Sequence, residues 1–452
     1  MKKLVTLLAA AGMVVAASAP ANAVDVKVSG FHAFTFETQQ QGFEGQNLEN
    51  AWQRTRLGLN FVASENLSGF LQFQMGSNQW GDYAGADKHG RNNVQTRQAY
   101  VDWIVPGTSV KVRMGRQQVG LPGEAFGDSS VMSAGWGGRD GIAVSAPVTD
   151  WLALNALWVR AGFAPEVDGD DKYADVDKNH NSDVFGLAAP MKFNGFAVTP
   201  WVAYAALDAA LEGSVGQGAS GIHKIYKDED GNEIGRFGGD ADAYWAGVTA
   251  TFSYFDPFTL KASFTYGSAD IEDGYADKEG WNAQVKATYK TAFGTPALGF
   301  WYASGDDKNA EYEGEGTMAH IKGRFMPTTT YHNGAWGLGG SEAFGREAMG
   351  GTWGVFAGIE GVSFIADLEH YAGVTYLEGT NHKDNEAYFD AGSYLTEEDS
   401  IVEFDFGTTY NIYKNFVANL ELSYLINDFG SEAGKDLDED DWRIGLTFQY
   451  NF

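Results

Sequence analysis

Basic side chains recur at every second position in the first part of this sequence. Arg54 and Arg56 form one such pair, and Lys111 and Arg113 form another. Because alternate residues of a β-strand point to the same face, each pair would lie on one face of a strand. A row of positive charges beside water can select ions electrostatically, or it can simply keep a polar surface hydrated. These rows are the first candidates for a functional site.

Oxygen-bearing side chains also recur at every second position in one polar stretch, as they do in calcium-binding loops. The residues are Asp175, Asp177, Asn179, Asn181 and Asp183. An EF-hand loop needs glycine at its sixth position and glutamate at its twelfth. This stretch has His180 and Gly186 there, so it is not an EF-hand. A looser Ca²⁺ or Mg²⁺ site and a solvated loop surface both fit the pattern, and no other cofactor is expected.

Catalytic chemistry has little support in this sequence. The eight histidines are scattered, and no His-Glu-x-x-His or Gly-x-Ser-x-Gly motif is present. Cysteine is absent, which excludes disulfides, thiolate metal sites and cysteine nucleophiles. The net charge of −29 argues against nucleic-acid binding, because contacts with phosphates need a basic surface. We therefore expect neither an enzyme nor a nucleic-acid-binding protein.

The end of the chain indicates which elements carry the candidate side chains. From Trp442 to Phe452, apolar or aromatic residues alternate strictly with polar residues. This alternation predicts a strand with one apolar face, and its length matches the ~9–11 residues of a tilted strand that crosses a bilayer. The same alternation recurs from Leu260 to Tyr266 and from Trp281 to Tyr289. A soluble β-sandwich would show it too, so other features must decide.

The connections between the predicted strands alternate between short turns and long polar loops. Ser64 to Asn66 and Gly358 to Gly361 are short turns, whereas residues 208–240 and 305–350 are long loops. Aromatic residues cluster at strand ends, as an interfacial girdle requires. The sequence therefore predicts a transmembrane antiparallel β-barrel of 18 strands, with short periplasmic turns, long extracellular loops and periplasmic termini. The count is 16 if the hairpin from Gly351 to Tyr371 does not form.

The N-terminus has the features of a secretory signal. Lys2 and Lys3 are followed by an apolar region from Leu4 to Ala17 and by the small residues of a cleavage site ending at Ala23. We expect residues 1–23 to be removed, which leaves residues 24–452 as a single barrel domain. Beyond Ala23 no apolar run approaches the ~18–20 residues of a membrane helix, so a spanning chain must form a closed barrel.

Several short motifs resemble the trimeric general porins of Gram-negative outer membranes. Arg56 to Phe61 resembles their second strand, Thr96 to Tyr100 their fourth strand, and Met114 to Gln117 the strand end before their third loop. The final strand resembles the C-terminal signal that the barrel-insertion machinery reads. The aromatic residues of that signal would be Phe448, Tyr450 and Phe452.

In those porins the third loop folds into the lumen, where its acids face arginines of the first strands. The resemblance implies that about residues 120–139 form this loop, and their many glycines would let the chain bend sharply. It also implies that Glu124 and Asp128 face Arg56 and Arg97 across a constriction. The full set of constriction candidates is Arg54, Arg56, Arg97, Arg113, Arg116, Glu124, Asp128 and Arg139.

The predicted function is a water-filled outer-membrane channel for passive diffusion of small hydrophilic solutes and ions. The resemblance implies a homotrimer with subunit contacts in residues 51–140, surrounded by outer-membrane lipid and lipopolysaccharide. Divalent cations could bridge the acidic loops to the anionic outer leaflet. Two alternatives stay open: a channel selective for a sugar or a small anion, and a structural or adhesive barrel without an open pore.

Overall fold

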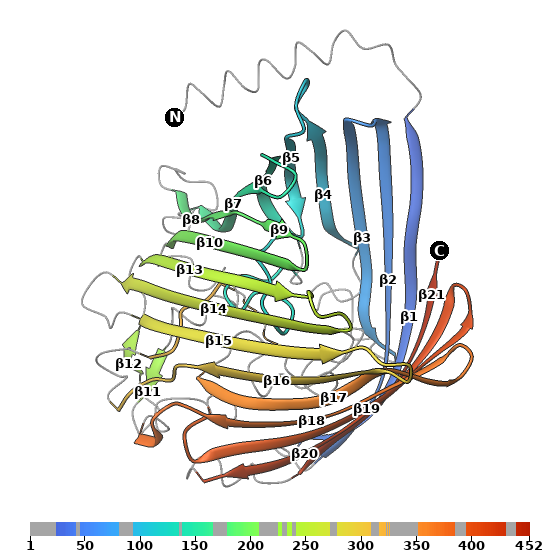
Figure 1. The fold of residues 1–452 in the computed structure, drawn as a ribbon, viewed down its shortest axis with the longest axis vertical. Helices are drawn as coiled ribbons and strands as arrows, with labels where there is room; N and C mark the ends of the chain where they lie inside the picture. Colours follow the sequence, from blue (N-terminus) through green and yellow to red (C-terminus); the bar gives the residue numbers. More distant parts are fainter. Residues whose placement is uncertain are drawn as a thin grey trace, which may run out of the picture.

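The computed structural model describes most of the chain that follows the predicted signal. It covers residues 24–41, 46–80, 94–134, 138–165, 179–207, 225–227, 233–236, 241–271, 278–308, 316–321, 323, 325, 351–384, 395–430 and 440–452. Within these ranges no helix is long and apolar enough to span a bilayer. The regular structure consists of β-strands, which lie side by side in the order of the chain (Figure 1).

The strands follow one another along the chain without an intervening helix in the described ranges. They are β1 (Asp25–Gln41), β2 (Gln46–Ser64), β3 (Leu67–Gln79), β4 (Val94–Ile104), β5 (Lys111–Gln117), β6 (Arg139–Pro147), β7 (Ala153–Pro165), β8 (Asn179–Ala188), β9 (Met191–Phe193), β10 (Phe196–Leu207), β11 (Ile225–Lys227), β12 (Glu233–Arg236), β13 (Ala241–Phe252), β14 (Phe258–Ile271), β15 (Lys278–Tyr289), β16 (Thr295–Ala303), β17 (Thr352–Ile365), β18 (Leu368–Gly379), β19 (Asp399–Tyr413), β20 (Phe416–Phe429) and β21 (Asp441–Asn451).

Consecutive wall strands pair antiparallel all the way around, and the last strand pairs with the first. Figure 1 shows β21 returning beside β1, and their register runs from Phe31 opposite Asn451 to Gln40 opposite Trp442. β8 and β9 both pair with β10, so they are two parts of one wall strand, interrupted at Pro190. β11 and β12 form a separate hairpin. The wall is a closed barrel of 18 strands, which confirms the predicted fold class and count.

One predicted turn is wrong, although its hairpin exists. β17 continues through Gly358 and Gly361, and the chain reverses only at Ala366 and Asp367. The pairing of β17 with β18 shifts register between Ile359 and Val362. Gly361 has a φ of 69°, a left-handed conformation that glycine adopts without steric cost, so the glycines accommodate a β-bulge instead of a turn. Because both strands are present, the 16-strand alternative is excluded.

The wall is apolar outside and mostly polar inside. On β14, Phe264 is 44% exposed, whereas its neighbour Thr265 is fully buried within the barrel. On β16, Leu298 is 65% exposed and Ala297 is 4% exposed. Exposed apolar side chains at alternate positions are what lipid, acting as the outer solvent, requires of a barrel strand. The polar faces are thus left for the interior.

The C-terminal residue closes the seam between the first and last strands. Phe452 N donates a hydrogen bond to Gly30 O at 3.0 Å, and Gly30 N donates one to Phe452 O at 2.8 Å. A side chain at Gly30 would lie 2.7 Å from the Phe452 ring. The His32 and Phe452 ring centroids are 5.2 Å apart. The terminal aromatic side chain therefore fits a notch that a glycine keeps open.

We expect Phe452→Asp to reduce the amount of folded barrel in the outer membrane by about tenfold or more. A carboxylate at this outward position would face lipid or the interface, where charge is costly. Heat-modifiable migration of membrane fractions on gels would measure it. Asn451→Asp is the matched control, because that neighbouring side chain points to the other face. Equal loss in both variants would show that added charge, rather than the position of Phe452, decides the outcome.

Candidate functional site

The loop between β5 and β6 lies inside the barrel. Leu121, Val131 and Met132 of this loop are buried and pack with Trp201 and Trp245, which point inward from β10 and β13. Phe126 packs edge-on against Trp301 of β16, with ring centroids 5.6 Å apart. Its ring also fills the space that a side chain at Gly299 would need. Apolar contacts therefore hold the loop against the wall from β10 to β16.

Polar contacts fix the same loop in register with the wall. Ala125 N donates to Ser263 Oγ at 3.1 Å, and Phe126 N donates to Gln284 Oε1 at 3.1 Å. Thr249 Oγ1 donates to Gly123 O at 2.8 Å. These partners lie on β13, β14 and β15, three neighbouring strands. Residues 123–126 of the loop are thus bonded to one side of the lumen.

Glu124 is the central polar anchor of this loop. Its carboxylate is 4% exposed and accepts hydrogen bonds from Ser130 Oγ at 2.7 Å, from Thr265 Oγ1 at 3.0 Å and from Gln284 Nε2. The prediction that Glu124 faces Arg56 is therefore wrong. Donors on β14 and β15 satisfy its oxygens at the wall, where charge-assisted hydrogen bonds are stronger than neutral ones.

Asp128 and Arg139 brace the loop from within. Asp128 accepts hydrogen bonds from the backbone N–H groups of Ser129 and Ala134, at 3.0 and 3.2 Å, and from Ser133 Oγ. Arg139 is 9% exposed, and it donates to Val119 O at 3.1 Å and to Ser133 O. Both side chains therefore form hydrogen bonds with Ser133, and the hydrogen bonds described for Asp128 stabilise the conformation of the loop.

A second segment, which sequence reasoning missed, also lies inside the barrel. Residues 316–321 belong to the predicted exposed loop 305–350, but Ala319 and Ile321 are buried. Ile321 N donates to Val131 O at 2.7 Å, and Trp245 Nε1 donates to Ala319 O at 2.8 Å. Lys278 Nζ donates to Thr317 Oγ1 at 3.1 Å. The segment thus packs between the first loop and the wall, and 305–350 is not an exposed loop throughout.

Arg56 and Arg97 project from β2 and β4, half-way around the barrel from these anchors. One residue joins them: Gln74 Oε1 accepts from Arg56 Nε at 2.8 Å and from Arg97 Nη1 at 3.3 Å. Arg54 and Arg97 are close enough for their like charges to repel. The pairing of β3 with β4 shifts register at Arg97, which makes Arg97 a bulge residue. This bulge explains why the sequence around Arg97 does not alternate cleanly.

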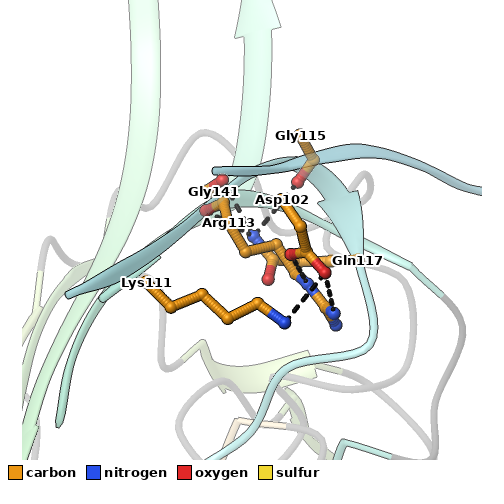
Figure 2. Close-up of polar contacts among 6 residues, drawn as sticks. All are labelled: Asp102, Lys111, Arg113, Gly115, Gln117 and Gly141. Carbon is orange, nitrogen blue, oxygen red and sulfur yellow. Dashed lines mark hydrogen bonds and ion pairs between the residues drawn. The ribbon is translucent and has the colours of Figure 1, made fainter. Parts of the chain in front are cut away.

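Arg113 has a carboxylate partner that the sequence analysis did not identify. Figure 2 shows Asp102 of β4 between Arg113 and Lys111 of β5. The Arg113 Nε–Asp102 Oδ1 and Arg113 Nη2–Asp102 Oδ2 distances are 2.6 and 2.8 Å, and Lys111 Nζ lies 2.9 Å from Oδ2. The Arg113 guanidinium also lies 4.0 Å from the Tyr100 ring centroid. Asp102 and Arg113 are directly opposite each other in the strand pair, so the hairpin register could have revealed them.

Two further predicted residues lie away from the lumen. Arg116 is three positions from Arg113 on β5, so it points to the outer face, where it pairs with Asp140 at 3.0 Å. The prediction that Arg116 flanks the constriction is therefore wrong. Asp183 of the acidic stretch pairs with Arg160 at 2.6 Å. Asp175 and Asp177, and the side chains of Asn179 and Asn181, lie outside the described residues.

Solved structures with the same overall fold include proteins of two bacteria. Pseudomonas aeruginosa OpdQ matches with a TM-score of 0.53 at 12% identity, covering 95% of this chain and 98% of that chain. P. aeruginosa OpdK, solved with vanillate, gives 0.55 at 11% identity over 95% and 98%. Acinetobacter baumannii OccAB4 gives 0.53 at 12% identity over 96% and 100%. At these identities the likeness shows the fold alone.

Comparison with curated protein sequences gives no match. The family described as Gram-negative porin matches residues 6–324, which is more than half of the chain. The inward loop and the side chains of Arg54, Arg56 and Arg97 all lie within that matched stretch. This chain belongs to the Gram-negative porin family and forms a passive channel in the outer membrane.

Proposed function

We propose that this porin conducts small hydrophilic solutes and favours small anions. The observation that carries the proposal is the cluster of Arg54, Arg56 and Arg97 on the wall opposite the anchored loop. Charged side chains along confined water select ions, and screening is weaker there than at an open surface. The loop supports the proposal by narrowing the route, so that a permeating solute passes near the arginines.

The individual candidates take different parts in this proposed constriction. Arg54, Arg56 and Arg97 supply the positive field, whereas Glu124, Asp128 and Arg139 hold the loop in place. Arg113 and Lys111 together contribute less than their two charges suggest, because Asp102 offsets one of them. Nothing in this arrangement needs catalysis or a cofactor, which fits transport by diffusion.

A substrate-selective channel for a small anion is the second candidate. OpdK was solved with vanillate, an aromatic carboxylate, and three clustered guanidinium groups suit a carboxylate through charge-assisted hydrogen bonds. Flux measurements in liposomes separate the candidates. A selective channel gives flux that saturates with one solute, whereas a general porin gives flux that rises linearly and depends on solute size.

The proposed setting is a homotrimer in the outer membrane, assembled after removal of residues 1–23. The short turns and both termini would face the periplasm, and the early strands would form the subunit contact. Support for the trimer and for the role of the insertion machinery comes from the resemblance to trimeric porins. Lipid and lipopolysaccharide would surround the apolar outer face, on which side chains such as Leu298 are exposed.

Reversing the charge of Arg56 and Arg97 tests the proposed anion preference. We expect Arg56→Glu with Arg97→Glu to lower the anion-to-cation permeability ratio at least roughly tenfold. The two changes alter the charge by four units, each unit about 10 Å away contributes ~0.4 kcal/mol even in bulk water, and ~1.4 kcal/mol is a factor of ten. Reversal potentials across a salt gradient in planar bilayers measure the ratio. Lys290→Glu is the control, since Lys290 is exposed in a turn between β15 and β16. Equal, small shifts in both proteins would show that Arg56 and Arg97 do not determine the ion selectivity. Absence of any conductance would indicate a structural barrel without an open pore.

Loss of the Glu124 anchor should loosen the loop. Glu124→Ala removes acceptors from three donors, and each such loss costs about 1–3 kcal/mol when a buried group stays unpaired. We expect larger open-channel current fluctuations and a modest rise in single-channel conductance. Glu124→Gln should have an intermediate effect, because it keeps one acceptor oxygen. If both variants changed selectivity equally without added fluctuation, the charge of Glu124 would matter and its anchoring role would not.

Protease accessibility on intact cells tests the proposed orientation. We expect cleavage within residues 208–240, but not between Ser64 and Asn66, which would face the periplasm. Residues 316–321 should also resist, because they are buried inside the barrel. Mass spectrometry of the fragments locates the sites. Cleavage at Ser64 to Asn66 before membrane disruption would reverse the assigned orientation.

A further inference from the structure

Gln74 of β3 makes an unusual set of contacts for an uncharged side chain. It is 9% exposed, and its Oε1 accepts hydrogen bonds from both Arg56 Nε and Arg97 Nη1. Its Nε2 donates to Gly76 O at 3.0 Å. The bond to Gly76 orients the amide, because the nitrogen must point to that carbonyl and the oxygen then points to the two guanidinium groups.

The local backbone prepares this orientation. Gly76 has a φ of 81°, which glycine adopts without steric cost, and the register of β2 with β3 shifts beside it, between Gln53 and Arg54. The bulge at Arg97 lies on the other side of Gln74, in the pairing of β3 with β4. Two irregularities thus flank Gln74, and bulges redirect side chains that a regular strand would hold apart.

The chemistry of the acceptor distinguishes this contact from three arginine ion pairs elsewhere in the described part of the barrel. Arg113 is held by Asp102, Arg160 by Asp183 and Arg443 by Glu37, and each carboxylate cancels a positive charge. The Gln74 oxygen carries only the negative end of an amide dipole. It can hold two guanidinium groups together without adding a negative charge of its own.

We propose that Gln74 is the positioning residue of the anion-selecting cluster: its neutral oxygen holds Arg56 and Arg97 side by side without cancelling their charge. Arg97 lies close enough to Arg54 and Arg56 for their like charges to repel. Without the shared acceptor the guanidinium groups separate, and positive charge spreads along the wall. The inference rests on the proposed anion preference and adds the residue that concentrates it.

The test compares a neutral change at Gln74 with the same change at Gln72. Gln74→Met keeps the length and removes the acceptor, and it leaves the formal charge unchanged. Gln72 lies two positions away on the same face of β3, and its Oε1 accepts from Gln98 Nε2 at 3.0 Å rather than from an arginine. Gln72→Met is therefore the matched control. Folded-barrel yield on heated and unheated gels verifies that both variants insert.

We expect Gln74→Met to lower the anion-to-cation permeability ratio at least about twofold, because dispersing a confined charge weakens its local field. Gln72→Met should leave the ratio at the wild-type value. Gln74→Glu should lower the ratio further, and more than Gln72→Glu, because its carboxylate would bind and neutralise the pair. Reversal potentials in planar bilayers measure all four variants. Wild-type selectivity in Gln74→Met would overturn the inference.

A double-mutant cycle separates this inference from the proposed function. In a background with Arg56→Gln and Arg97→Gln, Gln74→Met should change selectivity no further, since it acts through those arginines. An undiminished effect in that background would also overturn the inference.

If charge reversal of Arg56 and Arg97 left selectivity unchanged, the proposed anion preference would fail. A shift on charge reversal without a shift in Gln74→Met would reject only the role of Gln74. If Gln74→Met failed to insert, Gln74→Glu against Gln72→Glu would decide, and equal shifts there would reject the role.

Discussion

Backbone N–H and C=O groups in a wall that faces lipid have no water with which to form hydrogen bonds. Each of these groups must therefore find a partner within the sheet. The pairing of β1 with β21 meets this constraint at the last open edge. Two hydrogen bonds between Gly30 and Phe452 extend this pairing by one residue. Closure also forces the interior polarity. Apolar residues are used outside, and alternation leaves the remaining positions for the lumen.

An interior of this kind can bind parts of its own chain. Serine, threonine and glutamine on the inner face of β14 and β15 supply donors and acceptors for the inward loop, and Glu124 uses several of them. Tryptophans on β10, β13 and β16 add apolar surface beneath it. One side of the lumen is therefore packed like a protein core, while Arg54, Arg56 and Arg97 project from the side of β2 and β4.

The sequence predicted what depends on local periodicity and did not predict what depends on register or distant contacts. Alternation identified the strands, and the short turns and long loops between them fixed their count, because both are properties of each stretch alone. The turn at Gly358 to Gly361 was wrong because paired glycines suit a bulge as well as a turn. Asp102 was missed because finding the partner of Arg113 needs the hairpin register to within one residue. The partners of Glu124 on the barrel wall lie 141 and 160 positions away, beyond any local pattern.

The number of basic side chains in a lumen is therefore a poor measure of its field. Arg113 shares Asp102 with Lys111, and Arg443 lies against Glu37 and Glu421, so carboxylates offset part or all of the charge of these guanidinium groups. Arg56 bonds to an amide oxygen, which leaves its charge uncompensated by that contact. The Coulomb energy of an ion in the lumen depends on the net charge nearby, whereas the position of a guanidinium group depends on its hydrogen-bond acceptor. An amide oxygen can therefore position an arginine without neutralising it. A porin that needs a dense positive patch on a wall gains from neutral acceptors, because a carboxylate in that place would order the arginines and cancel them together.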